Sequence, residues 1–273
     1  MAAGRWPVNV RLVAGGLALG LVAGVALTAS LAPYDPIATD TAHVLEPPRR
    51  AHPFGTDDLG RDILSRVMHG ARISLAVGVA SVALAAAAGV PIGLAAGYWR
   101  RLDDPCMRLM DLILAFPAVI LALAIVAAVG PSLGNVMAAI AFVNIPVFAR
   151  LARGQTLTLR EREYVTAARA LGQRDGWIVA RHILPNASAA LIVQASLSIA
   201  FAILAEASLS FLGLGVQPPL PAWGSMLSLA RGYTELAPWL AIFPGLAIFV
   251  TVIGFNVLGD GLRDVLDPTV RRG

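Results

Sequence analysis

Lysine is absent from this 273-residue sequence, and cysteine occurs once, as Cys106. All 21 basic residues are therefore arginine. Without lysine, the chain has no Schiff-base nucleophile and no phosphate-binding loop of the G-x-x-x-x-G-K-[ST] type. One cysteine excludes an intramolecular disulfide and a metal site built from clustered cysteines.

Charge is also scarce. Only 14% of the residues are charged, whereas soluble domains carry about 25%. Hydrophobic residues make up 57% of the chain, and the mean hydropathy is +0.72. A soluble surface needs more charge than this, so we expect a membrane protein that contacts the lipid bilayer and binds no nucleic acid.

Long charge-free stretches predict the number of membrane spans. They cover residues 12–34, 73–99, 112–149, 182–205 and 236–259. A spanning helix needs about 20 apolar residues, so four stretches hold one span each. The 38-residue stretch is long enough for two, and a turn at residues 130–135, which contain glycine and proline, divides it. The sequence therefore predicts an all-α integral membrane protein with six transmembrane helices.

Two further apolar segments need separate interpretation. Residues 207–230 contain three prolines at positions 218, 219 and 221, which a spanning helix does not tolerate, so we expect an ordered, partly buried loop. The first span, at residues 12–34, has the basic start of a signal peptide, but its apolar run is too long for one. Gly16, Gly20 and Gly24 suit helix packing in lipid, which favours a retained helix.

The arginines predict the orientation. With the amino terminus inside, fifteen arginines fall in inner segments and six in outer ones, as the positive-inside rule requires. We therefore expect a multi-pass protein of the bacterial inner membrane with both termini in the cytoplasm. Residues 1–72 would comprise a cytoplasmic tail, the first span and a long extracytoplasmic loop. Residues 73–260 would form a core of five helices, and residues 261–273 a cytoplasmic tail.

The cytoplasmic connection at residues 150–181 is unusually long for a link between neighbouring spans. Its alanines and Leu171 favour a helix that Gly172 ends. Tyr164, Ala168 and Leu171 lie at i, i+4 and i+7 and would give this helix one apolar face. We expect it to lie along the membrane surface. The alternative is a charged loop helix that only satisfies the positive-inside rule.

Three separated motifs carry a family resemblance over nearly the whole chain. They are HPFGTDDLGRDILSR at residues 52–66, EYVTAARALG with HILPN within residues 163–186, and EASLSFLGLGVQPP at residues 206–219. Together they resemble inner-membrane permeases of ABC importers of the dipeptide/oligopeptide/nickel family. Within that family the chain is similar to the second permease of the pair, which has the long first outer loop.

The resemblance implies a type I ABC importer permease fold with a cytoplasmic coupling helix near residues 163–176. That helix would dock on an ATPase subunit through Glu163, Tyr164, Ala167, Ala168, Arg169, Gly172 and Asp175. Thr166 stands where the family's motif has Glu. As a transport subunit and not an enzyme, this chain would have no catalytic residues. It would bind no cofactor, and its partners would use ATP and Mg.

The implied partners are a second related permease, two cytoplasmic ATP-binding subunits and an extracytoplasmic solute-binding protein. The implied cargo is small peptides, with nickel or another small solute as the alternative. No cluster of His, Cys and Met points to nickel.

The outer motif contains Asp57, Asp58, Arg61 and Asp62. Three acidic residues would suit a hard cation, but helix capping explains them better, and we expect no metal. In that interpretation Thr56 caps the helix, and the negative charges of Asp57 and Asp58 stabilise its amino end. Asp62 pairs with Arg66 one turn further on. The resemblance makes Asp57, Asp58, Arg61 and Asp62 candidates for contact with the binding protein.

Glu206, Pro117 and Pro146 are candidates for the transport pathway or its gate. For Glu206 the alternative is a helix-end carboxylate at the headgroup level, paired with Arg231. Pro117 and Pro146 would kink their spans. Gly89, Gly93 and Gly97 predict close helix packing.

Two other classes of membrane protein remain as alternatives. An ion-coupled secondary carrier would need polar groups near the midplane or broken helices in repeated halves, and the charge-free spans supply few candidates. An intramembrane protease would need a base inside a span. His43, His52 and His69 fall in the outer loop and His182 at a cytoplasmic boundary, which disfavours a serine-type dyad.

Overall fold

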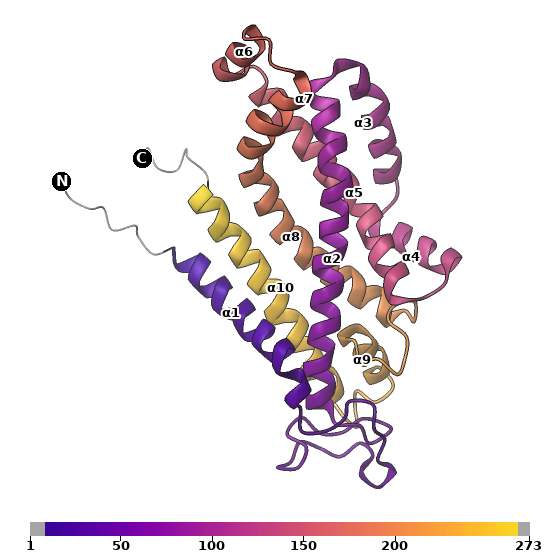
Figure 1. The fold of residues 1–273 in the computed structure, drawn as a ribbon. Coiled ribbons are helices and arrows are strands. Elements are labelled where there is room, and N and C mark those ends of the chain that lie inside the picture. The colour runs from indigo at the N-terminus through magenta and orange to yellow at the C-terminus, as the bar shows by residue number, and fades with distance from the viewer. Residues whose placement is uncertain (1–8, 267–273) are drawn as a thin grey trace, which may run out of the picture.

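A computed structural model describes residues 9–266, which form a helical bundle (Figure 1). The helices are α1 (Val10–Leu27), α2 (Ile63–Tyr98), α3 (Arg100–Leu114), α4 (Ala118–Val129), α5 (Leu133–Leu159), α6 (Glu163–Ala170), α7 (Asp175–Ile178), α8 (Leu184–Phe211), α9 (Trp223–Ala230) and α10 (Trp239–Leu266). One π-helical turn, Val179–Ile183, joins α7 to α8. The described residues contain no β-sheet.

Five helical segments are long and apolar enough to cross a membrane: Val10–Leu31, α2, α5, Asp175–Phe211 and α10. A sixth span is present if α3 and α4, which meet at an angle of 85°, are taken together. The prediction of six spans is thus met by five continuous helices and one bent pair. The expected start of this span at residue 112 is wrong, because the bent pair begins at Arg100. The bend lies just before Pro117, where the proline ring disfavours helical backbone in the preceding residue.

Helices α2 and α5 pack closely along the carboxyl-terminal half of α2. A Cβ atom on Gly89 would lie 2.6 Å from the main-chain oxygen of Ile145, and one on Gly93 would lie 2.2 Å from that of Ala149. A Cβ on Gly97 would lie 2.6 Å from Thr156 Cβ. No side chain fits at these three positions without a shift, so the predicted close helix packing is confirmed.

Helix α1 lies beside α10 (Figure 1), but not through the glycines that the sequence singled out. A Cβ on Gly16, Gly20 or Gly24 would meet no atom of the described residues within 4 Å. Gly15 makes the close approach instead, with its ideal Cβ 2.5 Å from Leu258 N. Gly15 faces α10, whereas Gly16, Gly20 and Gly24 lie on a face of α1 that does not contact α10. The predicted packing role of these three glycines is therefore wrong within this chain.

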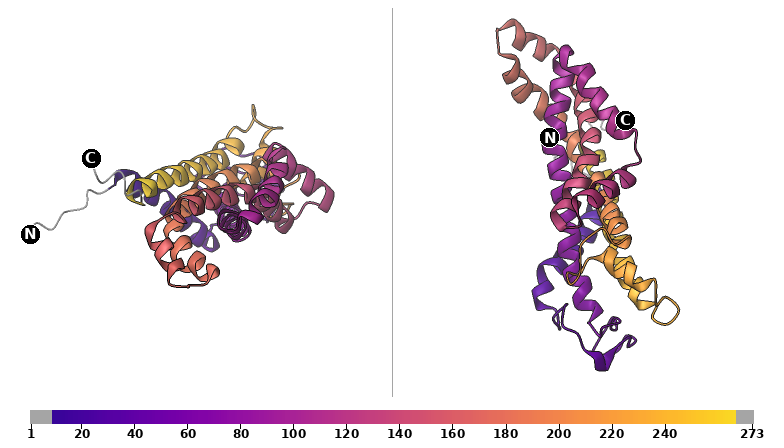
Figure 2. Two further views of the ribbon diagram at one scale, coloured as in Figure 1. Left: turned by 90° about the horizontal axis from the view of Figure 1, so that it is seen from above. Right: turned by 90° about the vertical axis from the view of Figure 1, so that its right-hand side faces the viewer.

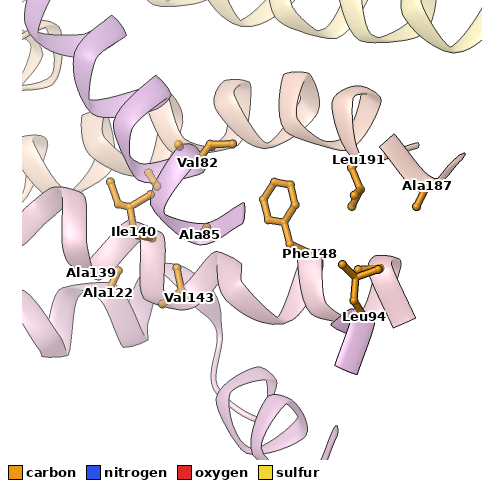
Figure 3. Packing of buried hydrophobic residues seen from close by; sticks show 14 of the residues in the cluster. Val82, Ala85, Leu94, Ala122, Ala139, Ile140, Val143, Phe148, Ala187 and Leu191 are labelled. Carbon is orange, nitrogen blue, oxygen red and sulfur yellow. The ribbon is translucent and has the colours of Figure 1, made fainter. Parts of the chain in front are cut away.

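The main core lies between α2, α4, α5 and α8. Phe148 of α5 is fully buried and projects among these helices, where Leu94, Val143 and Leu191 also lie (Figure 3). Since α2, α4, α5 and α8 all contribute apolar side chains to this one cluster, α5 is held against both α2 and α8. The bundle is elongated, with α6 and α7 at one end and the loop at residues 28–62 at the other (Figure 2).

The segment 207–230 is irregular only in its middle. Helix α8 continues to Phe211, and α9 begins at Trp223, so the predicted loop is confined to residues 212–222. Trp223 is buried, and its indole N–H donates to the main-chain oxygen of Val67 at 3.0 Å. An ideal Cβ on Gly224 would lie 2.5 Å from the main-chain oxygen of Ala207. These contacts dock α9 against α2 and α8, and three prolines lie in the loop as expected.

Candidate functional site: the cytoplasmic coupling segment

The segment between α5 and α8 contains two short helices instead of the single one predicted near residues 163–176. Helix α6 ends at Ala170, and α7 begins at Asp175. Gly172 has a φ of +75°, and its N–H donates to the main-chain oxygen of Arg169 at 3.0 Å. The glycine is the helix stop that the sequence predicted, but it also divides the expected helix in two. We call residues 163–178 the coupling segment.

One face of α6 packs on the bundle, and it is not the predicted face. Val165 and Ala168 are buried and belong to the main core. Tyr164 and Leu171 are 41% and 81% exposed, so the predicted face of Tyr164, Ala168 and Leu171 is wrong at two of its three positions. Leu171 follows the last residue of α6, so it no longer lies on the helical face.

The exposed side of the coupling segment combines apolar and polar side chains. Trp177 is 59% exposed, close to Leu171 and Tyr164 in sequence. Glu163, Ala167, Arg169 and Asp175 are exposed as well. Thr166 is also exposed, and its hydroxyl donates to the main-chain oxygen of Arg162 at 3.4 Å. All the predicted coupling residues except Ala168 are therefore accessible to a partner.

The coupling segment is tied to the carboxyl-terminal end of α2. The hydroxyl of Tyr98 donates to Asp175 Oδ1 at 2.7 Å, and the guanidinium of Arg169 lies 5.7 Å from the centre of the Tyr98 ring. Arg160 donates to the main-chain oxygen of Gly97 at 2.8 Å. The sequence analysis missed Tyr98, because no local pattern relates residues 77 positions apart.

At the opposite end of the bundle, the acidic residues of the outer motif form pairs inside the loop. Arg61 Nε lies 2.7 Å from Asp57 Oδ2, and Arg66 Nε lies 3.6 Å from the same oxygen. Asp62 caps α2 by accepting from Ser65 N at 2.8 Å. The expected cap, Thr56, instead bonds to the main chain of Glu46 and His43.

Three of the four candidates for binding-protein contact are buried by this pairing. Asp57, Asp62 and Arg61 are 1%, 2% and 9% exposed, so these side chains stabilise the loop and do not project from it. Asp62 pairs with His52 at 2.9 Å, which corrects the expected Asp62–Arg66 pair. Asp58 is partly exposed. Within residues 9–266, no group of three or more His, Cys, Asp or Glu side chains is arranged to hold a metal ion.

Glu206 lies inside the bundle, not at a helix end. It is fully buried, and it accepts from Ser210 Oγ at 2.7 Å and from Ser74 Oγ of α2 at 3.3 Å. The alternative of a pair with Arg231 is wrong, because Arg231 lies over the ring of Phe211, 5.7 Å from its centre. Ser210 also accepts from Val216 N at 3.2 Å, so the Glu206 network joins α2, α8 and the following loop.

The two proline candidates occupy different positions. Pro117 stands at the bend between α3 and α4, where a change of angle would move α4. Pro146 is buried within α5. A gating role for Pro117, Pro146 or Glu206 stays a prediction.

These features define a polytopic helical membrane protein whose long connection between α5 and α8 presents an exposed segment anchored to the spans. Residues 89–272 match the family described as binding-protein-dependent transport system inner membrane component. The chain belongs to this family. It is a permease component of a transport system and not an ATPase or other enzyme.

Three relatives illustrate the similarity. The chain is 50% identical to the dipeptide transport system permease protein of Alkalihalophilus pseudofirmus over 234 residues, covering 85% of this chain and 77% of the relative. It is 48% identical to the glutathione transport system permease protein of Pectobacterium atrosepticum over 262 residues, 95% of this chain and 87% of the relative. It is 48% identical to the di/tripeptide transport system permease protein of Pseudomonas aeruginosa over 248 residues, which cover 88% of this chain and 82% of the relative.

Proposed function

We propose that this chain is one of two related permease subunits of an ATP-driven importer for small peptides. The cargo proposal rests on the relatives, whose names specify dipeptides, di/tripeptides and glutathione. The remaining subunits would be two cytoplasmic ATP-binding proteins, which use ATP and Mg, and an extracytoplasmic solute-binding protein. The permease core would comprise residues 73–260, with residues 1–72 and 261–273 flanking it.

The exposed coupling segment is the single observation that carries this proposal. Leu171 and Trp177 expose large apolar surfaces at the end of the bundle where α6 lies. Exposed apolar side chains of this size mark a surface for another protein. Since Val165 and Ala168 anchor α6 in the core, a rotation of a subunit docked there would displace the spans as well.

The arrangement also supports both termini lying on the cytoplasmic side. The start of α1 and the end of α10 are adjacent, with Arg11 3.4 Å from Asp264. Both lie toward the same end of the bundle as α6 and α7 (Figure 1). The termini themselves, residues 1–8 and 267–273, lie outside the described residues. A periplasm-dependent reporter fused at residue 273 should be inactive and a cytoplasmic one active, and the reverse would contradict the proposed topology in the inner membrane.

Affinity purification in mild detergent, followed by mass spectrometry, tests the subunit composition. We expect a second permease and ATP-binding subunits to co-purify. Leu171→Asp should lose the ATP-binding subunits and keep the second permease, because it places a charge on the docking surface. Leu220→Asp is the matched control, since Leu220 is exposed in the loop before α9, far from the coupling segment. Recovery of the chain alone would overturn the proposal in favour of a secondary carrier.

Uptake of labelled peptide by the reconstituted complex tests the cargo. Proteoliposomes that contain the complex, its binding protein and ATP should accumulate labelled alanyl-alanine, and they should not do so with a non-hydrolysable ATP analogue. Accumulation of nickel, without that of the dipeptide or of glutathione, would reassign the cargo and leave the subunit composition intact.

A further inference from the structure

A groove between α5, α8 and α10 is lined by polar as well as apolar side chains. Its volume is about 630 Å³, which lies within the range of about 300–1,000 Å³ that small-ligand sites occupy. Three carboxamide side chains line it, Gln155 from α5 and Asn186 and Gln194 from α8. Arg263 contributes the one charged side chain, from the end of α10.

The carboxamides of α8 lie on one face of the helix. Asn186, Ala190 and Gln194 are four residues apart, so they form a stripe about 12 Å long. Asn186 and Arg263 mark the cytoplasmic mouth of the groove, because they lie near the start of α8 and the end of α10. Gln194 lies further along α8 toward the middle of the span.

These amides retain unused hydrogen-bonding capacity. Gln194 Nε2 donates to Ser198 Oγ at 3.2 Å, and Asn186 Nδ2 donates to the main-chain oxygen of His182 at 2.6 Å. A carboxamide has two N–H donors and an oxygen with two acceptor sites, so one such bond leaves most of its capacity available. Gln155 and Gln194 are partly exposed within spanning helices. Hydrocarbon would leave those groups unsatisfied at high cost.

A second groove provides the contrast. The space between α4 and α5 is lined by apolar side chains such as Leu121, Ile125 and Phe142, with Asn135 as its one polar contributor. That surface suits lipid tails or an apolar helix. The groove lined by carboxamides suits water and a polar solute.

We propose that the groove beside Gln155, Asn186 and Gln194 is the cytoplasmic section of the translocation route, where carboxamides bind the main chain of a small peptide. This inference rests on the proposed function. Carboxamides pair with peptide N–H and C=O groups whatever the peptide's side chains, which suits a route shared by many sequences. Arg263 at the mouth attracts the peptide's terminal carboxylate.

Cysteine labelling tests the inference without requiring transport. In a Cys106→Ser background, Gln194→Cys and Gln155→Cys are each introduced into the complete complex. Inside-out vesicles are treated with a membrane-impermeant maleimide, with and without a non-hydrolysable ATP analogue. Ile192→Cys is the matched control, because Ile192 lies at nearly the same depth of α8, is 51% exposed and faces away from the groove. Co-purification of the partner subunits shows that each variant is assembled.

We expect both glutamine positions to react at least about tenfold faster than position 192 in one nucleotide state, because water access permits formation of the reactive thiolate. We also expect the rate to differ between the two states. Reaction no faster than at position 192 in both states would overturn the inference and place lipid or the partner permease in the groove. Rapid labelling of these variants, together with a parent complex that takes up neither alanyl-alanine nor glutathione, would keep the route and refute only the peptide cargo.

Discussion

The hydroxyl of Tyr98 donates a 2.7 Å hydrogen bond to Asp175 Oδ1, which joins the last residue of α2 to the first residue of α7. Arg169 of α6 lies over the same aromatic ring. Helix α2 in turn packs against α5 through Gly89, Gly93 and Gly97. A displacement of the coupling segment would therefore be transmitted to two spans through these close contacts.

The Tyr98–Asp175 bond can be broken with little change of shape. Tyr98→Phe removes the donor and keeps the ring beneath Arg169. A hydrogen bond of this kind contributes about 0.5–1.5 kcal/mol, so we expect the peptide taken up per ATP hydrolysed to fall severalfold in proteoliposomes. Asp175→Asn is the control, because it keeps an acceptor oxygen and should retain more coupling. Identical ratios in Tyr98→Phe and the parent complex would show that this bond does not transmit the movement.

Gly172 is expected to be required for its backbone conformation. Its φ is +75°, and an added Cβ would meet no atom within 4 Å, so a substitution causes backbone strain without a steric clash. Left-handed backbone costs an L-residue about 1–2 kcal/mol. Gly172→Val should therefore shift the boundary between α6 and α7 and lower coupled uptake, while the thermal stability of the complex changes little.

Gly176→Ala is the matched control for Gly172→Val. Gly176 lies in the same segment, its added Cβ also meets no atom within 4 Å, and it has no left-handed backbone. Its uptake and ATPase activity should stay near the parent values. Unchanged substrate-stimulated ATPase and transport in Gly172→Val would remove the coupling role from this turn.

Because α2 packs closely against α5, two glycine substitutions should differ greatly in their effect on the melting temperature. Gly93→Ala places a Cβ 2.2 Å from the main-chain oxygen of Ala149, and overpacking of this kind costs about 1–3 kcal/mol. Gly16→Ala meets no neighbour and removes a flexible residue from a helix, which should leave stability unchanged or raise it. Thermal unfolding of the isolated chain in detergent compares the two. Equal melting temperatures would contradict the packing of α2 on α5.

The ionised carboxylate of Asp58 in the outer loop is expected to reduce the stability of the folded protein at neutral pH. Burial, and to a smaller extent the neighbouring Asp57, raises the pKa of the Asp58 carboxyl above its usual 3.8. Its Oδ1 is buried and has no hydrogen-bond partner among residues 9–266. Asp58 Oδ1 lies 3.7 Å from Arg61 Nη2, and this partly exposed ion pair contributes less than about 1 kcal/mol. At pH 7, which is well above 3.8, Asp58→Asn should therefore raise the melting temperature by about 1–3 °C.

The pH dependence provides the check on Asp58. As the pH falls through the raised native pKa toward 3.8, the carboxyl of the folded state becomes protonated and its cost disappears. The advantage of Asp58→Asn should then decrease toward zero. Asp104→Asn is the control, because the Asp104 side chain is 85% exposed and should show no comparable change. A gain in Asp58→Asn that stays constant with pH would indicate a cause other than this carboxylate.

Apolar length and glycine placement predicted most of the fold. The charge-free stretches located the spans, because hydrocarbon thickness sets a minimum length that few other structures need. Gly172 was recognised as a helix stop, and Gly89, Gly93 and Gly97 as a packing face, since both properties follow from the missing side chain. A kink at Pro117 was predicted, and the chain bends there by 85° between α3 and α4. The start of this pair at Arg100 was missed, because the charges of α3 concealed its continuity with the apolar α4.

The candidate site was predicted less completely than the fold. The coupling residues were located in sequence, but the buried face proved to be Val165 and Ala168, since α6 ends before Leu171. In the outer loop, Asp57 and Arg61 were expected to face a partner and are buried against one another. Acidic residues close together in sequence show the same pattern whether they are exposed or paired. Only the folded loop distinguishes these cases.

By itself, the sequence determined that this protein crosses a membrane about six times and has a long, family-specific connection between two of its spans, because composition and local spacing are properties of the chain alone. Tertiary structure decided that Tyr98 meets Asp175, that Glu206 is buried against Ser74 and Ser210, and that Gln155 shares a groove with Gln194. The residues of each group come from different helices or successive turns of one helix, and only the packing of the spans brings them together.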